Sequence, residues 1–541
     1  MVEQRRSNDP HVVVVGGGLA GLAATVELAS HGARVTLVEA NHHLGGKMNV
    51  LEAEGFTFDM GPTIITLPQV LRGILERAGR TPSDEIELVR LDPQWRCFYP
   101  DGARLDLLED PARMAAALDA QFPGTDAGAG WRRFVDYSRR MFRLSERVFF
   151  FRDLGAVTDL MNDPAGKDPG MLREVLAMRM HSTVGATIGK WVREPHAAQL
   201  AEHFLQYVGS SPFLAPAILS LIASAQIDQG CWYPMGGTRE VARSLARLAE
   251  QSENVEIVLG ERVASLRTEP ANGSAARVTG VELAGGRLIE ADAVVSNCDI
   301  QRTHTDLLGT SEAHAEQKSV RKKYEPACSG LVLYLGLDRQ YDHLAHHNFV
   351  FSGSSHREFA DIYTKGEPAA DPTIYLAAPS RTDPGQAPAG GEALYALIHT
   401  PYLRPHHEWH GDGGILERYR PVVIEKLKTV GGMPDLEDHI VVEKHLTPNM
   451  IDHMYNAEGG AIYGLASHGR FKGGFKPRNR SRLYSNLYFA GGSTNPGPGV
   501  PMVLMSGVTA ARAACEDAGV TLVGEPEAAE PERTHLEPLA V

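Results

Sequence analysis

The segment HVVVVGGGLAGLAATVELASHGARVTLVE, residues 11–39, decides the fold that this sequence predicts. It opens with the β-branched run Val12 to Val15, which is typical of a fully buried strand. Gly16, Gly18 and Gly21 follow in G-x-G-x-x-G spacing. In a strand–turn–helix unit the first glycine makes the tight turn, the second admits a pyrophosphate, and the third lets helix and strand pack closely.

The residues after the glycines complete the same unit. An Ala/Leu-rich helix is expected to end at Gly32, because glycine accepts a positive φ at a helix C-terminus. A second strand, residues 34–38, leads to Glu39, an acid placed to accept hydrogen bonds from a ribose diol. The full order predicts a dinucleotide-binding βαβ unit, and the alternative is a buried βαβ unit that binds nothing.

Composition limits the class of protein. A chain of 541 residues that is 43% hydrophobic can bury more than one core, and a formal net charge of −14 argues against a nucleic-acid binder. The sequence predicts no secretory signal and no transmembrane segment. Its five cysteines are scattered without C-x-x-C spacing, so we expect reduced thiols, most of them buried.

Two further turns follow Glu39 before the pattern becomes irregular. A nicotinamide enzyme would continue directly into another βαβ unit, whereas a long loop that crosses back over the cofactor favours FAD. The first turn carries paired glycines beside a lysine, and the second is a tight turn with the sequence DMGPT. The candidate cofactor-binding residues of these turns are Gly45, Gly46, Lys47, Gly61, Pro62 and Thr63.

A glycine- and proline-rich loop near the C-terminus predicts a third contact with the cofactor. The strand Leu487 to Phe489 precedes the loop GGSTNPGPGVP, residues 491–501, and a helix is expected to begin near Pro501. The positive N-terminal end of that helix can stabilise negative charge on a reduced flavin. A strand–loop–helix that only closes the fold is the structural alternative.

These motifs resemble those of the bacterial-type phytoene desaturases, which belong to the FAD-dependent, amine-oxidase-like flavoproteins. The resemblance covers nearly the whole chain and is most specific at its two ends. It implies that the turns at 45–47 and 59–63 line the flavin, and that the backbone of Val263 contacts the adenine. In the C-terminal loop it implies cofactor contacts by Gly491, Gly492, Gly499, Val500, Pro501 and Met502.

One position departs from the family pattern. The family loop reads G-x-x-x-H-P-G-x-G-[IV]-P, and Asn495 stands where that pattern has histidine. Asparagine can donate a hydrogen bond but cannot carry a proton near neutral pH. The catalytic acid or base is therefore unassigned by the sequence.

The predicted fold class is α/β, with a Rossmann-like FAD-binding domain interleaved with a mixed-sheet and helical substrate domain. The FAD-binding domain is expected at 10–91, 231–298 and 477–520. The substrate domain is expected at 92–230, where helical patterns and aromatic residues are frequent, and at 299–476. Residues 521–541 are predicted to be a disordered acidic tail.

Two features leave alternatives open. The apolar segment 213–227 is interpreted as a buried helix, a lipid-contacting surface or the mouth of a tunnel for a lipid-like substrate. The histidines of HLAHH (343–347) and PHHEWH (405–410) are expected to be solvated residues in surface loops. No metal ligands are predicted, and metal binding there is the less favoured interpretation.

The resemblance implies an FAD-dependent desaturase. It would introduce C=C bonds into phytoene, a C30 diapophytoene or a hydroxylated carotene by hydride transfer to flavin N5. Dioxygen or a quinone would accept the electrons, and the enzyme would be cytoplasmic, in peripheral contact with the inner face of the membrane. The alternatives are a carotenoid isomerase or terminal oxidase on the same scaffold, a flavin amine oxidase, and a non-enzymatic prenyl-lipid binder.

Overall fold

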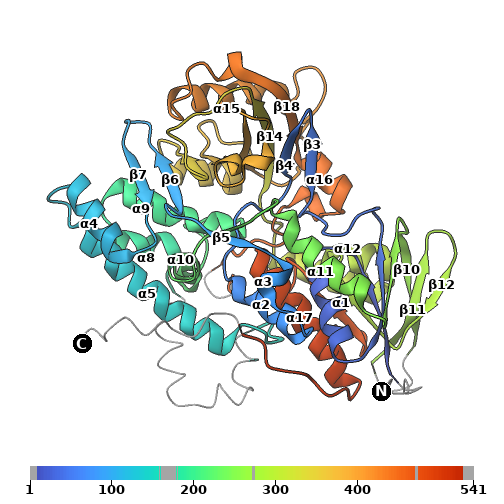
Figure 1. Cartoon of the computed structure of the whole chain (residues 1–541). Helices are drawn as coiled ribbons and strands as arrows, with labels where there is room; N and C mark the ends of the chain where they lie inside the picture. The colour runs from blue at the N-terminus through green and yellow to red at the C-terminus, as the bar shows by residue number, and fades with distance from the viewer. Residues whose placement is uncertain are drawn as a thin grey trace.

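A computed structural model describes residues 9–156, 159, 178–179, 181–270, 275–469 and 473–527. Figure 1 shows three regions: a nucleotide-binding region at the lower right, a sheet with its covering helix at the top, and a group of helices at the left. The first two regions are built from segments far apart in the sequence. The α/β class and the interleaved organisation predicted from the sequence are confirmed.

The nucleotide-binding region is organised on a five-stranded sheet in which every neighbouring pair is parallel. Three separate stretches of the chain supply its strands, so the first and last parts of the protein meet in one sheet. In spatial order the strands are β19 (Leu487–Phe489), β13 (Ala293–Ser296), β1 (His11–Val15), β2 (Arg34–Glu39) and β9 (Val255–Leu259).

Both faces of this sheet are covered, which is why its strands are continuous apolar runs. Val12 and Val14 of β1 pack against helices, whereas Val13 and Val15 pack against a small antiparallel sheet. The helices are α1 (Leu19–Ser30), α2 (Pro68–Arg77), α11 (Arg239–Gln251) and α17 (Val500–Asp517). The antiparallel sheet contains β10 (Val263–Glu269), β11 (Arg277–Leu283) and β12 (Leu288–Glu290).

The first and last helices of the nucleotide-binding region cross in close contact. A Cβ on Gly507 of α17 would lie 2.2 Å from the carbonyl oxygen of Ala20 in α1. Only glycine allows that approach. The N-termini of both helices are consequently held at the same side of the sheet.

A seven-stranded sheet forms the second region. One face packs on α15 (Ile415–Thr429), through residues such as Leu333, Ile398 and Val423. All neighbouring strands are antiparallel except β15 and β6. In spatial order they are β18 (Ile440–Leu446), β14 (Ser329–Leu337), β17 (Glu392–Thr400), β16 (Ile374–Ala377), β15 (His347–Val350), β6 (Trp95–Phe98) and β7 (Arg104–Leu107).

The other face of this sheet packs toward the helical region. That region contains α4 (Pro111–Gln121), α5 (Ala127–Val148), α8 (Val184–Trp191), α9 (Pro195–Glu202) and α10 (Leu221–Ile227). The further described elements are β3 (Val50–Ala53), β4 (Phe56–Asp59), α3 (Pro82–Glu85), β5 (Leu88–Arg90), β8 (Trp232–Pro234), α12 (Ile300–Arg302), α13 (Ser311–Lys323), α14 (Ser355–Ala360), α16 (Pro448–Tyr455) and several short 3₁₀ and π turns.

Most predicted elements occur where the patterns placed them, and β19 matches its predicted range. The strands β6 and β7 lie in a stretch that the sequence shows as predominantly helical. They are four residues long, too short for a clear alternation, and they form the edge of the seven-stranded sheet. No described helix is both long and apolar enough to span a membrane.

The segment 213–227 is mostly buried. Ile218 and Ile227 are 5% and 2% exposed, and Leu214 is 41% exposed. Of the three interpretations, the buried helix therefore describes most of the segment. Of the predicted acidic tail, residues 521–527 are described, and residues 528–541 lie outside the described residues. In the described part, the backbone N–H of Val523 donates a hydrogen bond to Nδ1 of His31.

Candidate functional site

A cavity of about 870 Å³ lies between the five-stranded and seven-stranded sheets. We call it the main cavity. Of the seventeen cofactor-binding residues predicted from the sequence, fourteen line it, and they come from three distant stretches of chain. They are Gly16, Gly18, Glu39, Gly45, Gly46, Lys47, Gly61, Pro62, Thr63, Val263, Gly491, Gly492, Gly499 and Val500.

The first glycine turn has the geometry that phosphate binding requires. Gly16 has φ +98°, and a Cβ on Gly21 would lie 1.9 Å from the Gly16 carbonyl oxygen. Gly21 thus stands behind the cavity and lets α1 approach β1. The helix begins after Gly18, and its first residues, Leu19 and Ala20, line the cavity. The N–H of Gly21 donates to Oδ1 of Asn297 at 3.1 Å, and no acidic residue in the first turn competes with a phosphate for this end of the helix.

Glu39 ends β2 at the cavity wall. Its Oε2 accepts a hydrogen bond from the N–H of Gly17 at 2.7 Å. Its Oε1 accepts from the backbone and side-chain nitrogens of Asn41 at 2.7 and 2.9 Å. A carboxylate offers about four acceptor positions, so one remains for a ligand hydroxyl.

The second turn packs directly on the first. The N–H of Gly45 donates to the Gly17 carbonyl at 2.8 Å, and a Cβ on Gly46 would lie 3.1 Å from the Cα of Gly18. Lys47 follows, with Nζ donating to the carbonyls of residues 461 and 462 at 2.9 and 2.8 Å. Burial lowers the pKa of Lys47 to about 8.

The C-terminal loop brings a second helix N-terminus to the cavity. Gly491 and Gly499 adopt φ values of +124° and +107°, and α17 begins at Val500 with no acidic residue in its first turn. The remaining two predicted residues, Pro501 and Met502, line a smaller neighbouring cavity. The loop therefore separates two cavities.

Asn495 does not lie among the residues that line the main cavity. It is 1% exposed and lines the smaller cavity. Its Nδ2 donates to the carbonyl of Arg152, and its backbone N–H donates to the carbonyl of Pro477 at 2.9 Å. In this geometry the amide holds the loop in place, which is a structural task.

The opposite half of the main cavity is lined by aromatic side chains, the buried His203 and His399, and the exposed His453. Tyr395, Leu397 and His399 alternate along β17, so all three face the cavity. Burial lowers the pKa of His203 to about 3 and that of His399 to about 4, so both rings are neutral at neutral pH. The aromatic residues are Tyr207, Phe349, Tyr375, Tyr395, Tyr455 and Tyr463.

No sequence motif predicted the residues of this half. The alternation in LYALIHT (394–400) was the available signal, but a buried strand shows the same pattern without any ligand. The nucleotide-binding region determines which face of β17 borders a cavity. Several parts of that region lie more than a hundred residues away from β17 in the chain.

A hydrogen-bonded chain connects the turn at residues 59–63 to the seven-stranded sheet. The hydroxyl of Thr63 lies 2.5 Å from the Tyr375 hydroxyl, which lies 2.8 Å from Nδ1 of His347. Burial raises the pKa of Tyr375 and lowers that of His347, so the chain is uncharged. It can orient a ligand at Thr63 without placing a charge beside an apolar substrate.

The histidine-rich loops differ from the prediction. His346, His347 and His407 are 6%, 0% and 8% exposed, so the expectation of solvated histidines is wrong for these three. They are held by side-chain and backbone acceptors. His407, for example, accepts from the N–H of Arg404 and donates to the carbonyl of Gly366.

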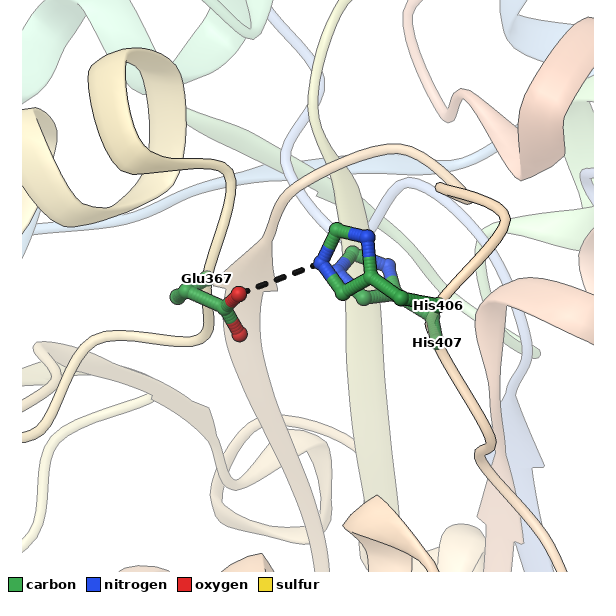
Figure 2. A group of neighbouring side chains, drawn as sticks. All are labelled: Glu367, His406 and His407. Carbon is green, nitrogen blue, oxygen red and sulfur yellow. Dashed lines mark hydrogen bonds and ion pairs between the residues drawn. The ribbon is translucent and has the colours of Figure 1, made fainter.

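Among the described residues, one group has the composition of a metal site. Figure 2 shows Glu367, His406 and His407, whose candidate ligand atoms lie within 4.8 Å of one another. Nε2 of His406 lies 3.1 Å from Oε1 of Glu367, and both side chains are exposed. Since both ring nitrogens of His407 already form hydrogen bonds, this group is better described as a loop contact than as a metal centre.

All five cysteines carry free thiols, as expected from their spacing. Four are buried and Cys298 is partly buried at the main cavity. Burial raises the pKa of Cys298 to about 12, which leaves it protonated.

Sequence comparison identifies similar proteins over almost the whole chain. Residues 19–515 match the family described as flavin containing amine oxidoreductase. A 4,4'-diapolycopene oxygenase from Methylomonas sp is 39% identical over 503 residues, which cover 93% of this chain and 97% of that protein. A 4,4'-diaponeurosporene oxygenase from Staphylococcus haemolyticus is 37% identical over 499 residues, covering 92% and 95%.

Solved structures show the same fold at much lower identity. An oxidoreductase from Methanosarcina mazei has a TM-score of 0.60 and 17% identity, covering 92% of this chain and 99% of that one. Putrescine oxidase bound to putrescine has a TM-score of 0.60 and 14% identity, covering 93% and 98%. At these identities the likeness concerns the fold alone.

Proposed function

Since this chain belongs to the flavin-containing amine oxidoreductase family, we propose that it oxygenates a long carotenoid polyene at the main cavity. It is a carotenoid-modifying flavoenzyme, and FAD is its cofactor. The finer assignment, oxygenation of a diapocarotenoid, follows the names of relatives that align over more than nine-tenths of the chain. The observation that carries it is a cavity with nucleotide-binding turns on one side and neutral aromatic side chains on the other.

The residues present fit FAD. The N-termini of α1 and α17 both open on the main cavity, and neither has an acidic residue in its first turn. Glu39 retains one acceptor position for a ribose hydroxyl, and the turns at 45–47 and 61–63 are suited to line the ring system. When bound, FAD accepts the electrons removed from the substrate.

The substrate half supports an uncharged ligand. Tyr395, Leu397 and the neutral His399 present a surface without formal charge, as a hydrocarbon chain requires. Among the described cavity residues, the carboxylates are those of Glu39, Glu261 and Asp299, all of which belong to the nucleotide-binding side. An amine substrate would lack a carboxylate partner in the substrate half, so the geometry favours a polyene over an amine.

Desaturation is the second candidate, because the N- and C-terminal turns resemble those of phytoene desaturases. Both reactions oxidise a C–H bond beside a conjugated chain, and they differ in whether oxygen is added. The relatives named as oxygenases make oxygenation the first choice. Dioxygen or a quinone is the proposed electron acceptor. In the oxygenation the added oxygen atom comes from dioxygen, or from water where a quinone takes the electrons.

A membrane-dissolved substrate also supports peripheral membrane contact, which we retain as part of the proposal. Co-sedimentation of the purified protein with anionic phospholipid vesicles tests it. A protein that stays in the supernatant at low salt contradicts this part.

The decisive experiment is expression in cells that accumulate either C30 or C40 acyclic carotenes. Oxygenation gives products that have gained oxygen, whereas desaturation gives products that have lost pairs of hydrogen atoms, and mass spectrometry distinguishes them. The purified protein should show flavin absorbance. A colourless protein, or unchanged carotenes beside a flavin-loaded protein, overturns the proposal.

A further inference from the structure

A second cavity, of about 110 Å³, adjoins the main cavity. Five residues line both: Ile64, Tyr207, Pro498, Gly499 and Val500. The partition is thus one residue thick and belongs partly to the loop before α17. Only these five residues lie between a chain in the main cavity and the second cavity.

The wall of the second cavity is mostly apolar. It includes Phe149 and Phe150, which directly follow α5, and Ile218 and Leu221 of the segment 213–227. The buried helix of this segment is therefore also a cavity wall. A surface of this kind suits a hydrocarbon chain.

Lys476 is an exception in this wall. It is 2% exposed, and its Nζ donates to the Ala466 carbonyl and the Ser467 hydroxyl, each at 2.9 Å. Within the described part of the chain no carboxylate forms an ion pair with it. Burial lowers the pKa of Lys476 to about 7, and its Nζ lies 5.9 Å from the centroid of the Tyr324 ring. Its two hydrogen bonds leave a third N–H, or a lone pair after deprotonation, without an oxygen or nitrogen partner among the described residues.

Ser145 on α5 is a second exception. It lines the same cavity, is 1% exposed, and its hydroxyl has no hydrogen-bond partner among the described residues. A buried hydroxyl without a partner is costly, since its lost hydration is not replaced. Two buried hydrogen-bonding groups with unused capacity in one apolar cavity indicate a ligand with an apolar body and a polar group.

We propose that the second cavity binds the oxygen-bearing group of the polyene, a hydroxyl or carbonyl, through hydrogen bonds from Lys476 and Ser145. This inference rests on the proposed function, because oxygenation creates such a group. Both oxygens accept hydrogen bonds from an amine or a hydroxyl. An unmodified hydrocarbon would leave both protein groups unpaired.

The site would make the protein prefer an oxygenated polyene over the parent hydrocarbon. One hydrogen bond from a partly charged amine corresponds to about tenfold or more in affinity. The enzyme would therefore release a partly oxidised polyene more slowly, so that it can be oxidised again before it dissociates. Intermediate and final product would accumulate in different ratios when the site is lost.

Binding is measured on flavin-loaded protein that is kept reduced under argon, so that no turnover occurs. The probes are an acyclic polyene hydrocarbon and its terminal alcohol and aldehyde of equal length, and the readout is quenching of tryptophan fluorescence. Trp95 lies 5.9 Å from the ring of Tyr207 in the partition, so bound polyene should quench it. Wild-type protein should bind the alcohol and aldehyde about tenfold more tightly than the hydrocarbon.

Two variants test the assignment. K476M should abolish most of this preference while hydrocarbon affinity stays within about twofold. S145A removes a hydroxyl without a protein partner, so the fold should be unaffected and the preference should fall about threefold or more. Matched controls are K426M, a buried lysine that pairs with Asp371, and S138A, a buried serine on α5 that donates to the Phe134 carbonyl.

Equal affinity for all three probes in wild-type protein overturns the inference. So does an alcohol or aldehyde preference that both K476M and S145A retain. If K476M fails to fold, S145A decides alone. These outcomes are separate from the failure of the proposed function, which would appear as absent flavin or absent polyene oxidation in the wild-type protein.

Discussion

The two halves of the main cavity would recognise their ligands by different means. On the nucleotide-binding side the groups offered are backbone N–H atoms of turns and helix N-termini, with Glu39 as a side-chain acceptor. On the substrate side the surface is made by side chains of β14 to β17, such as Tyr395 and His399. The first half depends on which residues lack a side chain, and the second on which side chains are present.

This difference makes the nucleotide-binding half more sensitive to a single added methyl group. Gly21→Ala would place a Cβ 1.9 Å from the Gly16 carbonyl oxygen, a contact that requires the helix and strand to separate. We expect destabilisation of about 3 kcal/mol or more and protein that retains no flavin. Flavin absorbance per protein and the thermal unfolding midpoint measure both effects.

The control is another helical glycine in the helical region. Gly189 of α8 is exposed and a Cβ there meets open space, so Gly189→Ala should stabilise by about 0.5–1 kcal/mol. Normal flavin content in Gly21→Ala would show that the close approach is not required.

A substitution of Glu39, the hydrogen-bond acceptor of the nucleotide-binding half, should have a smaller effect than Gly21→Ala. Glu39→Gln removes the charge and one acceptor oxygen, and leaves two backbone donors competing for the other. FAD affinity should fall by about 2 kcal/mol, or about thirtyfold, because hydrogen bonds to a charged group are the stronger kind. Reconstitution of apoprotein, followed by flavin fluorescence, measures the dissociation constant.

Glu256→Gln on the neighbouring strand β9 is the matched control. This exposed carboxylate pairs with Arg287 at the surface, and its loss should leave FAD affinity unchanged. If both variants bind FAD as the wild type does, the ribose contact assigned to Glu39 is wrong.

In the substrate half, the buried His399 should make the stability of the protein depend on pH. The folded-state pKa of His399 is about 4 because the ring is buried, whereas an unfolded chain titrates near 6.5. Between these values the unfolded chain binds a proton that the folded chain does not. This contribution to stability is complete above pH 6.5 and is lost as the pH falls toward 4, by up to about 1.4 kcal/mol per pH unit.

His399→Gln removes that proton uptake. Its unfolding midpoint should therefore fall less steeply between pH 6.5 and 4 than that of the wild type, with exposed His314→Gln on α13 as a control. Parallel pH profiles for wild type and His399→Gln would contradict a buried, neutral ring. Comparing the two pH profiles separates the contribution of His399 from that of buried carboxyl groups. Those groups have raised pKa values, so they make the folded state more stable as the pH falls.

The hydroxyl of Tyr375 joins the two halves. Tyr375→Phe removes the link between Thr63 and His347, and we expect a loss of about 1 kcal/mol in stability with about tenfold slower polyene oxidation. Flavin content should be unchanged. Tyr419→Phe is the control, since its hydroxyl donates to the Ala369 carbonyl away from the cavity and its loss should affect stability alone. Equal rates in the two variants would contradict the orienting role.

The difference between the halves also explains what the sequence could predict. Glycine spacing, helix starts and the acid after β2 are local patterns, since each turn is completed within a few residues. Gly16, Gly45 and Gly499 could therefore be identified, and the structure gathers them in one cavity. Their contacts with FAD remain a prediction that the first two experiments test.

The residues of the substrate half cannot be identified from local sequence patterns. Tyr395 and His399 lie on one face of a strand that is buried on both faces, and the sequence of β17 does not show which face borders a cavity. Likewise Lys476 is a loop lysine in the sequence, and its burial beside Tyr324 depends on a part of the chain more than a hundred residues away. Burial of His346 and His347 was missed for the same reason, because it depends on strands far away in the chain.

The smallest effect is expected outside both halves, at the loop contact of Glu367 and His406. His406→Ala should change stability by less than about 0.5 kcal/mol, because the pair is exposed and such surface contacts contribute little. A chelator should leave flavin content and activity unchanged, since both ring nitrogens of His407 form hydrogen bonds, one with the N–H of Arg404 and one with the carbonyl of Gly366. A stoichiometric metal that His406→Ala removes would contradict this, and would mean that His407 exchanges its hydrogen bonds for a ligand bond.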